Sequence, residues 1–94
     1  MNIPRITAVE PLPEYRLLVT FDNGAQRVYD CTPLLDRNSF RLLRTPAFFR
    51  SVAVDPGGYG ISWSDEADLA ESELWCNGVD PTAELAGGIV TARA

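Results

Sequence analysis

Residues 15–30, YRLLVTFDNGAQRVYD, decide the fold of this chain. Two β-rich runs flank Asn23-Gly24, and this dipeptide readily supplies the positive φ angles that a tight hairpin turn requires. The stretch therefore predicts a β-hairpin with a two-residue turn. Because an isolated hairpin is only marginally stable in water, we expect the rest of the chain to pack on it.

The alternation of side chains along the first hairpin strand predicts its core face. Side chains at every second position share one face of a strand, and the apolar set here is Tyr15, Leu17, Val19 and Phe21. A two-residue turn pairs Leu18 with Tyr29 and Val19 with Val28. This register predicts that Gln26, Val28 and Asp30 lie on the core face of the second strand, and that Leu18 and Tyr29 lie on the outer face.

Patterns elsewhere in the chain predict an α+β fold, in which antiparallel β-hairpins pack with two or three short helices. Strands are expected over 3–10, 51–55 and 59–63, and short helices within 33–50 and over 70–76. The length of 94 residues suits a single domain. We assign it to residues 1–80 and expect 81–94 to form a flexible tail.

The composition excludes several kinds of chemistry. There is no histidine, so the chain has no Ser-His or Cys-His nucleophile, and no glycine-rich phosphate loop is present. We therefore expect a non-enzymatic protein with no cofactor. The sequence contains no leader-like segment and no apolar run long enough to span a membrane, which favours the cytoplasm and reduced thiols at Cys31 and Cys76.

Charge is distributed unevenly along the chain. The formal net charge is −5, yet seven of the eight basic residues, all arginines, precede residue 51, and eight of the 13 acidic residues follow it. An acidic half repels the phosphate backbone, so direct binding to nucleic acid is not expected.

The acidic residues offer one candidate polar cluster, formed by Asp30, Asp65 and Asp68. Asp30 ends the second hairpin strand, where a capping role is favoured over a catalytic one. The run from Asp65 to Glu73 is interpreted as a solvated loop and helix N-terminus in preference to a Mg²⁺ or Ca²⁺ site, and the same charges would attract a basic partner.

The outer face of the predicted hairpin offers the better binding surface. Its candidate interface residues, with one aromatic residue from the last helix, are Arg16, Leu18, Thr20, Arg27, Tyr29 and Trp75. Aromatic and arginine side chains are enriched at the centres of interfaces. Trp63 is predicted to lie in the core, whereas Trp75 suits the core and an interface equally well.

Several motifs together resemble the bacterial family known as domain of unknown function 2442. They are Tyr15-x-Leu17-x-Val19-x-Phe21-x-x-Gly24, Val28-Tyr29-Asp30 with Leu34-Leu35, Phe48-Phe49 before Val52, Ile61-x-Trp63, and Asp68-Leu69 with Leu74-Trp75-x-x-Gly78. The resemblance implies a small α+β domain. It also implies one of two contexts: a neighbouring small reading frame in a toxin–antitoxin-like pair, or fusion to a C-terminal helix-turn-helix domain, for which too few residues follow Gly78.

Two functional hypotheses follow. The first is a protein-interaction module, the antitoxin-like half of a two-gene system, which forms a homodimer or binds a cognate small protein. The alternative is a small ligand-sensing or catalytic domain that uses Asp30, Asp65 and Trp63.

Overall fold

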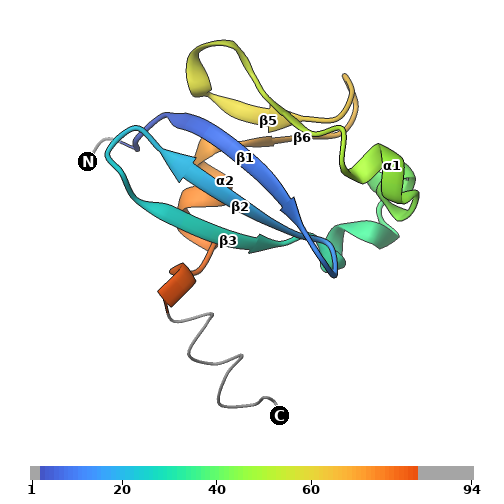
Figure 1. Ribbon diagram of the computed structural model, residues 1–94. Helices are drawn as coiled ribbons and strands as arrows, with labels where there is room; N and C mark the ends of the chain where they lie inside the picture. Colours follow the sequence, from blue (N-terminus) through green and yellow to red (C-terminus); the bar gives the residue numbers. More distant parts are fainter. Residues whose placement is uncertain (1–2, 83–94) are drawn as a thin grey trace.

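A computed structural model describes residues 3–82, which form two three-stranded antiparallel sheets and several short helices (Figure 1). The predicted α+β class is confirmed. The strands are β1 (Ile6–Leu12), β2 (Arg16–Phe21), β3 (Gln26–Asp30), β4 (Ala53–Val54), β5 (Gly60–Ser62) and β6 (Asp68–Ala70). The helices are η1 (Thr32–Asp36), η2 (Asn38–Arg44), α1 (Pro46–Phe49), η3 (Pro56–Gly58) and α2 (Glu71–Asn77), where η marks a 3-10 helix. The tail prediction for 81–94 falls almost entirely outside the described residues.

The predicted hairpin is present as β2 and β3, but its turn contains three residues rather than two. The N–H of Phe21 donates to the carbonyl of Ala25 (2.9 Å), and Gly24 adopts a left-handed φ of 86°. The Asn23 side chain accepts a further bond from the Ala25 N–H (2.9 Å), which stabilises the wider loop. Asn-Gly is therefore compatible with a three-residue loop that ends in a left-handed glycine.

The wider turn shifts the register by one residue, so the predicted pairing is wrong. Leu18 lies opposite Val28, not Tyr29, and Leu17 lies opposite Tyr29. A one-residue shift exchanges the two faces of a strand. Consequently Tyr29 lies on the core face of β3, whereas Asp30 is exposed on the other face.

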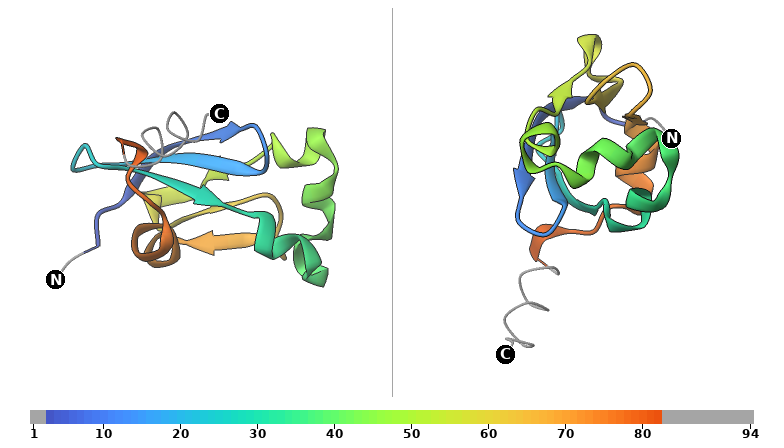
Figure 2. Two further views of the ribbon diagram at one scale, coloured as in Figure 1. Left: turned by 90° about the horizontal axis from the view of Figure 1, so that it is seen from below. Right: turned by 90° about the vertical axis from the view of Figure 1, so that its right-hand side faces the viewer.

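Residues 32–50 form three short helices, as the sequence indicates. Pro33 and Pro46 stand near the starts of η1 and α1, where a fixed φ and a missing N–H cost nothing. The three helices lie together at one end of the molecule (Figure 2). They contribute Leu34, Leu35, Phe40, Leu43 and Phe49 to the core.

The second sheet contains one strand that the sequence did not reveal. The predicted strands over 51–55 and 59–63 correspond to β4 and β5, and the predicted last helix corresponds to α2. Residues 68–70 form β6, although the acidic run favoured a loop there. Leu69 pairs with Ile61 and is buried, while Asp68 and Ala70 remain exposed. Three residues are too short a run for their alternation to be recognised.

The core lies between the two sheets and is closed by the helices. Leu17, Val19 and Phe21 are at most 1% exposed, which confirms the predicted core face of β2. Their cluster continues into the second sheet through Ile61 and Leu69. Figure 2 shows the two sheets stacked, with α2 beside them and η1, η2 and α1 at the far end.

Both cysteines are free thiols, as expected. Cys31 is completely buried in the core, while Cys76 is exposed on α2. Burial, assisted by the nearby charge of Asp30, raises the pKa of the Cys31 thiol to about 12. Cys31 therefore serves as a small apolar core residue, because the thiolate is the reactive form.

Candidate functional site

The outer face of the first sheet faces away from the core, and no element of residues 3–82 crosses it in Figure 1. The observed register assigns to this outer face Ala8, Glu10, Leu12, Arg16, Leu18, Thr20, Gln26, Val28 and Asp30. It is one continuous surface of three strands. Antiparallel sheets often expose one face to water, so the nature of its side chains decides whether it is suited to binding.

An apolar row crosses the middle of this outer face. Leu18 pairs with Val28, and Val28 in turn forms an isolated antiparallel bridge with Val79. The two bridge hydrogen bonds, from each valine N–H to the other's carbonyl, are 2.7 and 2.9 Å long. Val28 is only 7% exposed yet lies outside the core cluster, and Val79 is 46% exposed. The apolar row Leu18–Val28–Val79 is thus a hydrophobic strip separate from the core.

Polar pairs border the apolar row on both sides. On one side the Gln26 amide donates to the Thr20 hydroxyl (3.1 Å). On the other side Arg16 lies opposite Asp30 in the register. An apolar centre with a polar rim is the usual composition of a protein-binding patch.

The predicted interface residues do not share one surface. Arg16, Leu18 and Thr20 lie on the outer face, but Arg27, Tyr29 and Trp75 belong to the opposite side of the sheet. There the Arg27 guanidinium stacks on the Trp75 ring (3.9 Å to its centre), and that ring packs edge-on against Phe21. The three-residue turn explains the error, because it rotates Arg27 and Tyr29 onto the core face.

The surroundings of Tyr29 indicate a structural role and not a role in binding. Its side chain is 6% exposed, and its hydroxyl donates to Glu73 on α2 (2.7 Å). Burial, together with the hydrogen bond to the Glu73 carboxylate, raises the pKa of Tyr29. The Asn77 amide donates to the other oxygen of Glu73 (3.0 Å), so this network fastens α2 to β3.

The residues of the candidate polar cluster do not form a site. Asp30 accepts a bond from the Thr32 N–H (2.9 Å), so it satisfies a backbone donor as predicted, although the N-cap of η1 is Cys31. Asp65 and Asp68 are exposed, and the Trp63 indole donates to the Phe49 carbonyl (2.9 Å) while stacking on its ring. Within residues 3–82, no group of three His, Cys, Asp or Glu side chains is arranged to hold a metal ion.

Sequence reasoning missed a groove between the β1–β2 turn and α1. Its volume is about 400 Å³, and it is lined by Pro11, Leu12, Pro13, Glu14, Tyr15, Pro46, Phe49 and Arg50. The lining is mostly proline, leucine and aromatic side chains, with one acidic and one basic residue. The prolines were visible in the sequence, but only the tertiary fold brings residues 11–15 against 46–50.

The turn that forms one wall of the groove has an unusual backbone. Glu14 and Tyr15 both have positive φ angles, 64° and 62°. This conformation is rare for an aromatic residue and must be held by its surroundings. Three contacts hold Tyr15: its ring packs edge-on against Phe49 (5.4 Å between centres), its hydroxyl donates to the Arg44 carbonyl (3.2 Å), and its carbonyl accepts from the Cys31 N–H (2.8 Å).

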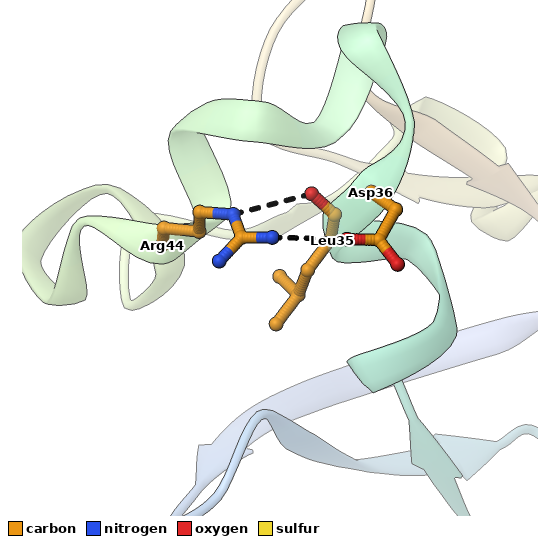
Figure 3. Close-up of polar contacts among 3 residues, drawn as sticks. All are labelled: Leu35, Asp36 and Arg44. Carbon is orange, nitrogen blue, oxygen red and sulfur yellow. Dashed lines mark hydrogen bonds and ion pairs between the residues drawn. The ribbon is translucent and has the colours of Figure 1, made fainter.

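Arg44 links the helices beside this groove. Its Nε donates to the Leu35 carbonyl (3.3 Å), and a terminal nitrogen contacts the Asp36 carboxylate at 3.1 Å (Figure 3). Both side chains remain largely exposed, so the ion pair contributes little to stability. Its effect is positional: it joins η1 to the end of η2 while the guanidinium stays accessible.

Comparison with known proteins gives one match. A family model described as "Protein of unknown function (DUF2442)" matches residues 6–80. No curated protein and no solved structure matches the chain. Among the described residues, every helix is too short or too polar to cross a membrane.

Proposed function

The chain belongs to the DUF2442 family of proteins of unknown function, and we propose that it is a non-enzymatic interaction module that binds a protein through the outer face of its first sheet. The observation that carries the proposal is the apolar row Leu18–Val28–Val79, which lies outside the core and is bordered by polar pairs. Its partner is a small cognate protein or a second copy of the chain. In a toxin–antitoxin-like pair, the partner would be the product of the neighbouring gene.

The chemistry of the remaining surface supports a binding role over a catalytic one. The sequence has no histidine. Asp30 is hydrogen-bonded to the Thr32 N–H and Trp63 packs against the core, so no contact in residues 3–82 favours the sensing or catalytic alternative. The outer face instead offers the surface composition that protein partners recognise.

The variant Leu18→Lys tests the outer face without disturbing the core. Leu18 lies opposite Glu10 in the register, so a lysine there gains an oppositely charged neighbour across the strands. The matched control is Ser72→Lys, which makes the same charge change at an exposed position of α2. Far-ultraviolet circular dichroism checks that both variants are folded.

If the partner is a second copy, sedimentation velocity at increasing concentration should show a dimer for the wild type and for Ser72→Lys. Leu18→Lys should remain a monomer, because a charge within the apolar row must be desolvated on association. A dimer that is equally stable in Leu18→Lys would contradict the role of this face.

A further inference from the structure

The groove between the β1–β2 turn and α1 has the properties of a preformed side-chain pocket. Its walls come from prolines and from the packed pair Tyr15 and Phe49, whose positions are fixed by the contacts described above. Rigid walls lose little conformational entropy when a ligand binds. A volume of about 400 Å³ is large enough for one or two apolar side chains.

The helical segment that supplies one wall of the groove is rich in arginine, although the protein as a whole is acidic. Residues 32–50 contain four arginines, Arg37, Arg41, Arg44 and Arg50, and all four are exposed. Asp36 is the one acidic residue in this segment, and it is paired with Arg44. Every charged residue from 51 to 82 is acidic, so the arginines stand out against the net charge of −5. Leu42, 60% exposed, lies between two of these arginines in the sequence.

We propose that this groove binds a short segment of another protein in which a large apolar side chain is flanked by carboxylates. The apolar side chain would enter between Tyr15, Phe49 and the prolines, where it is removed from water. The carboxylates would meet Arg50 at the rim and the arginines of η2 beyond it, since the guanidinium fork suits a carboxylate. The lining also contains Glu14, which repels other carboxylates, so the carboxylates of the segment are expected near Arg50 and away from Glu14.

A peptide explains the groove better than a nucleic acid does. Nucleic-acid binding is dominated by phosphate contacts and is opposed by an acidic protein. The lining here is mainly apolar and contains one basic residue, Arg50, so it offers few partners for a phosphate backbone. The inference does not depend on the outer-face proposal, because the two surfaces share only Leu12.

A display library of random 12-residue peptides tests this inference without assuming a sequence. Peptides selected on the whole protein should be enriched in Asp and Glu around a Leu, Ile, Phe or Trp. Their binding, measured by fluorescence anisotropy of the synthetic peptides, should weaken as salt is added.

Two variants with the same change in net charge locate the site. Arg50→Gln at the rim should weaken peptide binding about tenfold, the effect expected for one charge-assisted hydrogen bond. Gln26→Glu, exposed on the outer face, should leave it unchanged. The inference is overturned by neutral or basic selected peptides, by no enrichment at all, by equal weakening in both variants, or by tighter binding of a fluorescent single-stranded RNA than of any peptide.

Discussion

Gly58→Ala should lower the free energy of unfolding by about 2–5 kcal/mol, because it combines backbone strain with a steric clash. Gly58 has a φ of 77°, and a Cβ at this position would lie 2.5 Å from the carbonyl oxygen of Ile6. The backbone of β1 would have to move to accept it. Since this contact is where η3 meets the first sheet, the substitution disturbs the packing of the two sheets.

Gly24→Ala is the matched control for Gly58→Ala. Gly24 has a similar φ of 86° in the hairpin turn, but nothing lies within 4 Å of an added Cβ. Only the conformational cost remains, about 1–2 kcal/mol. Urea unfolding followed by the fluorescence of Trp63 and Trp75 measures both variants. If both variants lost the same free energy of unfolding, the contact between Gly58 and β1 would not be a tight one.

Tyr29→Ala should destabilise the protein by about 3–5 kcal/mol, the usual cost of truncating a buried aromatic side chain. Its control is Tyr59→Ala, because Tyr59 is 56% exposed and stacks on Arg5 at the surface. Loss of that exposed stack should cost about 1 kcal/mol or less. The comparison also tests the register of the hairpin. If Tyr29→Ala were as mild as Tyr59→Ala, Tyr29 would lie on the outer face, as a two-residue turn requires.

The dependence of stability on pH gives Tyr29 a second test. Its pKa is raised in the folded protein above the ordinary value of 10.0, so the unfolded chain loses the phenolic proton first as the pH rises. Its contribution to stability is therefore complete below pH 10 and declines as the pH rises above it. Cys31, with its raised pKa, gives a similar decline that begins near pH 9. In Tyr29→Phe the free energy of unfolding should fall less steeply as the pH rises above 10. An unchanged slope would show that other groups cause the whole of the alkaline decline.

The sequence predicted the parts of the fold that depend on local patterns. Alternation identified the buried positions Leu17, Val19 and Phe21, and Asn23-Gly24 marked the place of the turn. The turn length could not be predicted, because the same dipeptide fits loops of two and three residues. One additional loop residue was enough to exchange the two faces of β3, so two of the six predicted interface residues, Arg27 and Tyr29, were placed on the wrong side of the sheet.

The candidate surfaces depend mainly on contacts between distant residues. The apolar row needs Val79 to bridge β3, and nothing in the local sequence around residue 79 indicates that pairing. The groove likewise needs the β1–β2 turn to approach α1, and its strained Tyr15 carries no special sequence signal. Leu18 was identified in advance because its position on the outer face does not depend on the turn.

Affinity capture from an extract of the native host, with Leu18→Lys and Ser72→Lys as paired baits, tests most directly whether the outer face binds a protein. Wild type and Ser72→Lys should retain the same specific partner, or an untagged second copy of the chain, and Leu18→Lys should lose it. Retention of that partner by Leu18→Lys at the wild-type level, or the absence of any specific partner on all three baits, would contradict the interaction-module function.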